Sequence, residues 1–161
     1  MAASRQAYSL PHRKLIGVDS RIPDNGPMIE KINPSTVHDP AGYSHVTIST
    51  ASRLVHLAGQ CPLDRAGTIV GGPGDYTAQT DQVITNCLAV LEAAGVTPAD
   101  VVRSVIYVVS PDNAFLSAVW HQVNTSPLGP AFTTASTLLG VASLGYPGQL
   151  VEIDLTAATS D

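Results

Sequence analysis

A single glutamate in an apolar stretch is the side chain best suited to acid–base chemistry. Glu152 lies in the run "LVEIDL" (150–155), where strand alternation places it on one face with Asp154. A carboxylate near a strand end can simply face water, but one in a half-closed cleft can act as a general acid or base. We expect Glu152 to be the catalytic residue.

The stretch "TTASTLLGVASL" (133–144) precedes Glu152 and contains no charged residue. It carries hydroxyl groups on Thr133, Thr134, Ser136 and Thr137. Such residues are common in ordinary strands, and each hydroxyl can donate one hydrogen bond to a carboxylate. An arginine would donate two parallel, charge-assisted bonds. We expect Ser136 and Thr137 to bind substrate, without a strong grip on an anionic one.

Further candidate binding residues precede the middle of the chain. Tyr43 and His45 share strand parity, so both can line one wall of a pocket. Alternatively, Tyr43 is a rim residue and His45 a hydrogen-bonded wall residue. Gly59 allows close approach of a ligand or of a neighbouring strand, and Gln60 and Cys61 follow it. Nothing near Cys61 in the sequence would lower its pKa, so we expect a pocket-edge residue and not a nucleophile.

Metal and cofactor motifs are absent from the sequence. The two cysteines, Cys61 and Cys87, have neither the number nor the spacing of a zinc site or a disulfide framework. "GGPGD" is not followed by the Lys-Ser/Thr of a phosphate loop. The histidines, none of which form a metal-binding pair on one helix, are His12, His38, His45, His56 and His121. We expect no metal and no cofactor, His56 within a sheet, and Cys87 in the core.

The elements that must position these residues can be read from hydrophobic periodicity. Two neighbouring strands are expected to pair with each other, and a short extra strand follows them. A long helix then has an apolar stripe and ends near Gly95. The expected order β-β-(β)-α-β-α-β-β comprises 43–49, 54–60, 68–70, 76–95, 102–110, 114–124, 134–144 and 149–158. This order predicts an α+β fold. Trp120 and Phe115, on the second helix, suit the core or an interface.

Composition limits the classes of partner. The chain has 161 residues, which suits one domain (31–161) preceded by an N-terminal extension (1–30) that is rich in turn-forming residues. Only 13% of the residues are charged, which indicates a surface partly covered by other subunits. The net charge is −5 without a basic cluster, so we expect no binding to nucleic acid or to an acidic membrane. Cysteine usage and the absence of a signal peptide favour a reducing cytoplasm.

Several segments together resemble the reactive intermediate deaminase family (RidA, also called YjgF-type). They are "AGYSHV", "LAGQCPLD", "AGTIVGG", "QTDQVITNCLAVLEAAG", "DVVRSVIYV" and "LVEIDLTA", in the family's order and spacing over about residues 32–158. The resemblance implies a chorismate-mutase-like α+β domain with two helices on one face of the sheet. It implies a homotrimer with three clefts between subunits. It also implies cofactor-free hydrolysis of enamines and imines to a keto acid and ammonia.

The resemblance also carries over site residues, with one departure. The family's glutamate falls on Glu152, its tyrosine on Tyr43 and its glycine on Gly59, whereas the position of its carboxylate-binding arginine falls on Ser136. We therefore expect a homotrimeric enzyme acting on an imine, enamine or enol-type intermediate that is larger or less anionic than a 2-imino acid, and not an efficient 2-iminoacid deaminase. Two alternatives stay open. One is a non-catalytic trimer that binds a ligand or stabilises a partner; the other is a deaminase in which another arginine, such as Arg65, substitutes.

Overall fold

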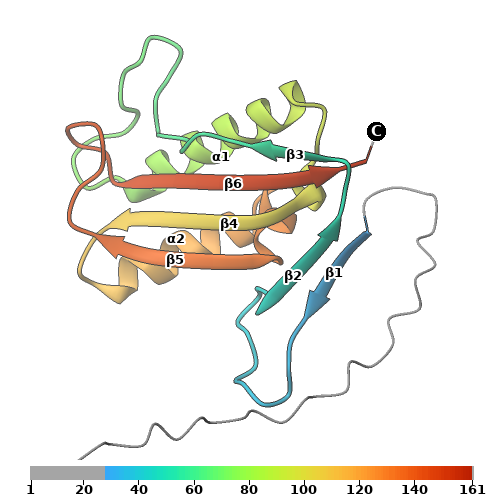
Figure 1. Cartoon of the computed structure of the whole chain (residues 1–161). Coiled ribbons are helices and arrows are strands. Elements are labelled where there is room, and N and C mark those ends of the chain that lie inside the picture. Colours follow the sequence, from blue (N-terminus) through green and yellow to red (C-terminus); the bar gives the residue numbers. More distant parts are fainter. Residues whose placement is uncertain (1–27, 161) are drawn as a thin grey trace, which may run out of the picture.

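A four-stranded sheet carries two helices on one of its faces (Figure 1). The computed structural model describes residues 28–160. The strand order is β3 (Arg53–His56), β6 (Val151–Thr159), β4 (Val101–Val109) and β5 (Ala135–Val141). Strands β4 and β5 are parallel, whereas β6 runs antiparallel to both β3 and β4. The predicted α+β class is confirmed.

A separate two-stranded sheet precedes the main one. It pairs β1 (Met28–Ile32) antiparallel with β2 (Val46–Thr50). The expected N-terminal extension (1–30) lies outside the described residues as far as residue 27, and its expected end falls inside β1. The extra strand expected at 68–70 is reduced to an isolated bridge between Leu63 and Ile69.

The expected pairing of 43–49 with 54–60 is wrong. Strand β2 pairs with β1, and β3 pairs with β6. Only Ala51 and Ser52 separate β2 from β3, and a two-residue hairpin turn normally needs Gly, Asn or Asp in conformations with positive φ. Within residues 28–160, glycines alone have positive φ. The chain therefore passes from one sheet to the other without reversing into a hairpin.

Each of the two helices begins directly after an aspartate that caps it. Helix α1 (Tyr76–Ala93) is capped by Asp75, and α2 (Asn113–Asn124) is capped by Asp112, each through its side-chain oxygen. Gly95 has φ +73° immediately after α1, as expected of a glycine that ends a helix. The two short 3₁₀ helices are Pro98–Asp100 and Gly129–Phe132.

The hydrophobic core lies between the sheet and the two helices. Alternate residues of β6 (Val151, Ile153 and Leu155) are buried, and they pack with residues of α1 such as Val83 and Cys87. Because side chains alternate across a strand, the residues between them, including Glu152, lie on the opposite face of the sheet. That face carries no helix (Figure 1).

The threonines at the start of β5 hold the β1–β2 hairpin against the main sheet. The Thr47 hydroxyl pairs with the Thr134 hydroxyl at 2.7 Å and accepts the Ala135 N–H at 2.9 Å. Lys31 Nζ donates to Thr133 Oγ1 at 2.6 Å. The hydroxyls of Thr133 and Thr134 are therefore used in packing one sheet against the other.

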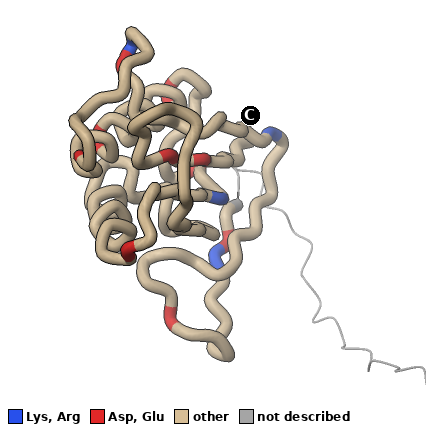
Figure 2. The backbone as a smooth tube through the Cα atoms, turned by 90° about the vertical axis from the view of Figure 1, so that its left-hand side faces the viewer, with Lys and Arg blue, Asp and Glu red and all other residues tan. Residues whose placement is uncertain are grey.

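Charged side chains are sparse and dispersed over the described surface (Figure 2). Blue and red positions do not gather into a large patch of one sign in that view. Among residues 28–160, no helix has the length and apolar character that crossing a membrane would require.

Candidate functional site

The Glu152 carboxylate is fixed by two donors on one of its oxygens. Gln149 Nε2 donates to Glu152 Oε2 at 2.8 Å, and Cys61 Sγ lies 3.6 Å from the same oxygen. Within the described residues, Oε1 has no hydrogen-bond donor. The site therefore holds the carboxylate by Oε2 and leaves Oε1 free to exchange a proton.

Gln149 is a site residue that the sequence did not reveal. It is only 3% exposed, and its Oε1 accepts the Tyr146 N–H at 3.1 Å. Because that N–H can only donate, it fixes the orientation of the amide, so that Nε2 must face Glu152. The turn at 145–148 makes this contact, and sequence alone does not specify how that turn folds back.

A second buried glutamine supports the same segment. Gln79, on α1, donates to the Gly148 carbonyl at 2.9 Å and accepts the Leu150 N–H at 2.7 Å. A signal for it exists in the sequence, because Gln79 falls on the same helical stripe as Val83 and Cys87. A polar residue in a buried stripe needs a partner, and here the partner is the backbone on either side of Gln149.

Gly59 is required by the position of the carboxylate. A Cβ atom at residue 59 would lie 2.8 Å from Glu152 Cδ and closer still to Oε1. The neighbouring Gln60 exchanges backbone hydrogen bonds with Ile153, at 2.8 and 3.2 Å. Four of the candidate residues, Gly59, Gln60, Cys61 and Glu152, thus lie close together.

The Cys61 thiol is protonated at neutral pH. Burial raises its pKa, and the negative charge of Glu152 raises it further. This agrees with the prediction that Cys61 is not a nucleophile, since the thiolate is the nucleophilic form. Cys87 lies in the core, where burial raises its pKa to about 12.

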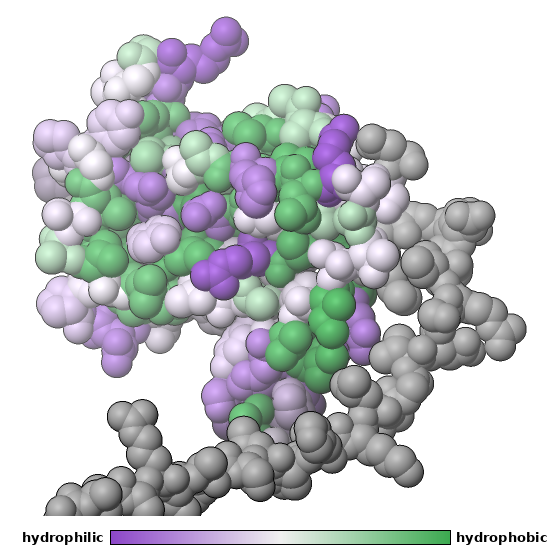
Figure 3. All heavy atoms as spheres, in the orientation of Figure 1, coloured by the Kyte–Doolittle hydropathy of each residue, from purple (hydrophilic) through white to green (hydrophobic). Residues whose placement is uncertain are grey.

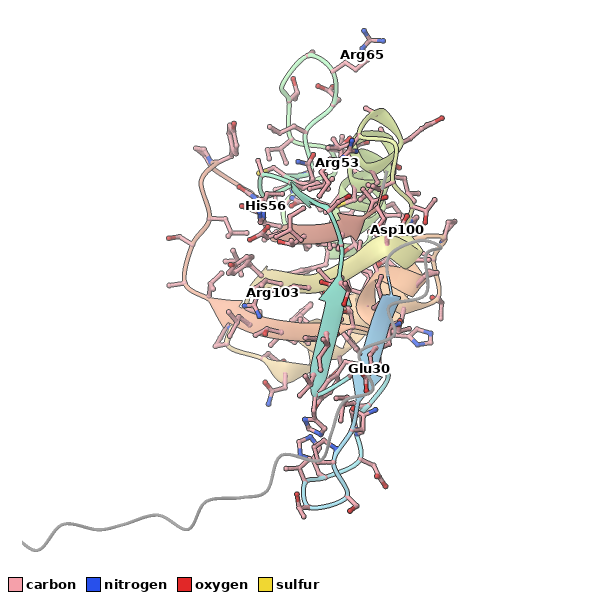
Figure 4. All side chains as sticks on the ribbon, turned by 45° about the vertical axis from the view of Figure 1, so that its right-hand side comes forward. Glu30, Arg53, His56, Arg65, Asp100 and Arg103 are labelled. Carbon is pink, nitrogen blue, oxygen red and sulfur yellow. The ribbon has the colours of Figure 1, made fainter. Side chains whose placement is uncertain are left out.

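A pocket of about 570 Å³ adjoins this group. Its lining includes Gly59, Gln60 and Cys61, together with Asn86 of α1, whose amide donates to the Cys61 and Leu63 carbonyls. Arg65 also contributes to the lining, but its side chain stands at the end of the 61–75 loop and points away from the sheet (Figure 4). Within one protomer, the Arg65 guanidinium does not lie against Glu152.

Tyr43 and His45 form a second group with His38. The Tyr43 hydroxyl lies 2.7 Å from His38 Nε2, and His45 Nε2 lies 2.8 Å from the His38 carbonyl oxygen. The three rings meet edge to face, with centroids 4.8 to 6.4 Å apart. His56 lies elsewhere, on β3, where its ring is 3.4 Å from the Thr156 hydroxyl.

A second pocket, of about 410 Å³, is formed beside Tyr43. It is lined by Ala41, Tyr43, Trp120, Ser136, Thr137 and Leu138. Ser136, the residue expected from the resemblance to replace the family's arginine, has a hydroxyl that is already bonded to Ser104 Oγ at 2.6 Å and to the Phe132 carbonyl at 2.9 Å. Trp120, which the sequence allowed only a core or interface role, is part of this pocket.

The two groups are separated within one protomer. Strand β4 lies between β6, which carries Glu152, and β5, which carries Ser136. Glu152 faces the same side of the sheet as Tyr107 and Leu139, whereas Ser136 shares its side with Ser104. The candidate residues therefore form two half-sites, one around Glu152 and one around Trp120, and no residue lines both pockets.

The described residues hold no cluster of three or more His, Cys, Asp and Glu side chains placed as a metal site would need. The carboxylates and histidines named above lie in separate groups. The chemistry that the site can support is therefore proton transfer by Glu152 and the binding of small molecules in the two pockets.

Comparisons with known proteins agree with this architecture. A family profile described as Endoribonuclease L-PSP matches residues 35–159. Protein DfrA of Myxococcus xanthus is 39% identical over 118 residues, which is 73% of this chain and 85% of DfrA. The RutC family protein PH0854 of Pyrococcus horikoshii is 43% identical over 58 residues, and the match spans 35% of this chain and only 44% of that protein.

Solved structures show the same fold. The crystal structure of YyfB from Yersinia pestis, of the conserved Rid protein family, matches with a TM-score of 0.72 and 39% identity, covering 81% of this chain and 98% of YyfB. RidA from the Antarctic bacterium Psychrobacter sp. PAMC 21119 matches with a TM-score of 0.53 and 26% identity, covering 80% and 98%. The chain therefore belongs to the Endoribonuclease L-PSP family, which is the RidA or YjgF family that its sequence resembles.

Proposed function

We propose that the protein is a cofactor-free enzyme that hydrolyses or rearranges an imine, enamine or enol-type intermediate in a reducing cytoplasm. The observation that carries this proposal is the state of the Glu152 carboxylate. Its Oε2 is held by Gln149 and Cys61, and its Oε1 lies over the Gly59 backbone without a donor among the described residues. In a carboxylate held in this way, the hydrogen bonds to Oε2 fix its position and Oε1 can exchange a proton with the substrate.

For an imine, Glu152 Oε1 would accept a proton from water as the water oxygen bonds to the imine carbon. The π electrons of the C=N bond move to the nitrogen, to which Glu152 passes the proton taken from water. In the tetrahedral intermediate Glu152 then accepts the hydroxyl proton as that oxygen forms the new C=O bond, and it transfers this proton to the nitrogen as the amine leaves. Cys61 contributes a neutral hydrogen-bond donor, because its raised pKa keeps the thiol protonated.

We further propose that the active unit is a homotrimer in which the two half-sites of different subunits meet. Glu152 and the Trp120 pocket lie two strands apart in one protomer, so a single chain does not complete the site. The helix-free face of the sheet presents apolar patches between polar side chains (Figure 3). Leu139 lies on the same side of the sheet as Glu152 and is well exposed. A surface of this kind suits coverage by neighbouring subunits.

The same half-sites argue against efficient hydrolysis of 2-imino acids. No cationic side chain lines the Trp120 pocket, and Ser136 already donates to protein atoms. Arg53 donates to the Ala94 carbonyl (Figure 4). Arg103 lies on β4, four residues before Tyr107, which pairs with Glu152. Neither Arg53 nor Arg103 lines the Trp120 pocket.

Ammonia release from freshly generated 2-iminopropanoate tests this proposal with a gain of function. Wild type should scarcely exceed the spontaneous rate, whereas Ser136→Arg should gain turnover, which Glu152→Gln in the same background should abolish. Rapid wild-type turnover would contradict the loss of the carboxylate-binding group and favour the alternative in which Arg65 substitutes. If both wild type and Ser136→Arg fail to exceed the spontaneous rate, the non-catalytic ligand-binding trimer becomes the better account.

A further inference from the structure

The pocket beside Trp120 is chemically unlike a site for a carboxylate. None of its six lining residues belongs to the Glu152 group, and none of the six is charged. Its volume of about 410 Å³ falls in the ordinary range for small-molecule sites. The question is which class of ligand such a lining recognises.

The polar groups that face this pocket are largely satisfied by the protein. Trp120 Nε1 donates to the Ala41 carbonyl at 3.2 Å, and the Tyr43 hydroxyl pairs with His38 at 2.7 Å. The Ser136 hydroxyl has one proton, and both Phe132 O and Ser104 Oγ lie within hydrogen-bond distance of it. Thr137 supplies the remaining side-chain hydroxyl, and it is uncharged.

The walls of the pocket are apolar and preorganised. The Trp120 indole is held by its bond to Ala41 and by an edge-to-face contact with the buried Phe132 ring, whose centroid is 6.1 Å away. Leu138 and the Tyr43 ring complete the walls. A fixed aromatic wall favours the face or edge of another ring.

A carboxylate entering this pocket would lose water and find no cation or free pair of donors in return, which opposes binding. An uncharged ring would lose little on leaving water and would contact aromatic and aliphatic carbon. An apolar cavity of about 150 Å³ is already large enough to bind benzene in another protein. The volume here therefore admits a ring with a short substituent.

We propose that the Trp120 pocket binds an uncharged aromatic group, and that this group is the part of the substrate remote from the reacting carbon. This inference rests on the proposed imine chemistry in one respect only, namely that the bound aromatic group is part of a substrate. Binding itself requires no turnover, so it can be tested separately.

Trp120 provides the measurement, because it is the single tryptophan of the chain. We would titrate the full-length protein with 2-phenylacetamide and with phenylacetate, two probes of nearly the same shape that differ in charge. Tryptophan emission would be recorded, with N-acetyltryptophanamide as the control for non-specific quenching. Wild type should give a saturable change with phenylacetamide and bind it at least ~10-fold more tightly than phenylacetate.

Two arginine substitutions provide matched controls. Ser136→Arg adds a cation to the pocket lining and should reverse the preference in favour of phenylacetate. Ser143→Arg adds the same charge at an exposed loop position outside this pocket and should keep the wild-type preference. Circular dichroism would establish that each variant is folded.

Equal or tighter binding of phenylacetate by wild type would overturn the proposal, and so would the absence of a saturable change with either probe. Those wild-type results do not depend on whether Ser136→Arg folds. If the protein binds phenylacetamide saturably but hydrolyses no imine, the aromatic-binding pocket is supported and the proposed catalysis is rejected. If it hydrolyses imines in a Glu152-dependent way but does not bind phenylacetamide, the catalysis is supported and the aromatic-binding pocket is rejected.

Discussion

At the scale of single residues, the Glu152 group couples a carboxylate to a neutral thiol. Cys61 lies 3.6 Å from Glu152 Oε2, and the negative charge of Glu152 adds to burial in raising the Cys61 pKa. Cys61 therefore reports on the charge and position of the proposed catalytic group, even before a substrate is known. Cys87 is buried in the core, with a pKa of about 12, and serves as an unreactive internal reference.

Glu152→Gln should accelerate alkylation of Cys61 by iodoacetamide at pH 7.5. Removing the negative charge lowers the thiol pKa, and the fraction of reactive thiolate rises as the pKa falls, by ~3- to 10-fold for a change of half to one pKa unit. The rate should then reach its half-maximal value at lower pH than in wild type. Mass spectrometry of the two cysteine peptides measures both sites, and an unchanged Cys61 profile would show that the two groups do not interact.

At the scale of elements, the periodic segments were predictable and their partners were not. Helix α1 was predictable because its apolar stripe and Gly95 are local features, and the face of β6 that Glu152 occupies was predictable because that strand alternates. The pairing of β2 with β1 was not predicted, because the alternation of apolar and polar residues along a strand does not determine which strand it pairs with. Gln149 and Trp120 were missed because a turn and the β5 edge bring them to their sites. The partner of β2 and the positions of Gln149 and Trp120 depend on tertiary contacts, which the sequence does not reveal.

Gln79 should contribute strongly to stability, because it satisfies two backbone groups on the segment that carries Gln149. Gln79→Leu leaves the Gly148 carbonyl and the Leu150 N–H without these partners, and we expect a loss of about 2–4 kcal/mol in the free energy of unfolding. Gln82→Leu is the control on the same helix. The Gln82 amide donates to a side chain, Asn86, and its loss should change stability by less than ~1 kcal/mol. Urea denaturation measures both, and equal effects would contradict this role.

At the scale of the whole molecule, one chain carries two separate groups of candidate residues, which the proposed trimer would bring together. The Glu152 group lies toward one side of the sheet, and the Trp120 pocket lies at the β5 edge. The family name includes the word endoribonuclease, but the net charge of −5 and the dispersed Lys and Arg residues (Figure 2) do not suit an RNA backbone. The proposed function, in which small-molecule chemistry takes place between subunits, uses both groups.

The oligomeric state should depend on the helix-free face of the sheet. Leu139 on that face is 41% exposed, and Phe115 on α2 is 42% exposed, so the two differ in location and not in exposure. Wild type should sediment with the mass of three 16.7 kDa chains. Leu139→Asp should dissociate it, since a charge buried at an interface is costly, whereas Phe115→Asp should leave it assembled. A monomeric wild type, or dissociation by Phe115→Asp alone, would contradict the trimer.

The most direct test of the central claim compares two imines in one assay. N-benzylidenemethylamine is an aromatic imine without a carboxylate, and its hydrolysis gives benzaldehyde and methylamine. By contrast, 2-iminopropanoate carries a carboxylate. The measured quantity is the ratio of enzymatic to spontaneous hydrolysis for each imine, in wild type and in Glu152→Gln. We predict a larger ratio for the uncharged imine, reduced by at least ~10²-fold in the variant, as expected for loss of a general acid or base. A larger ratio for 2-iminopropanoate, or the same ratio in both proteins, would contradict the account.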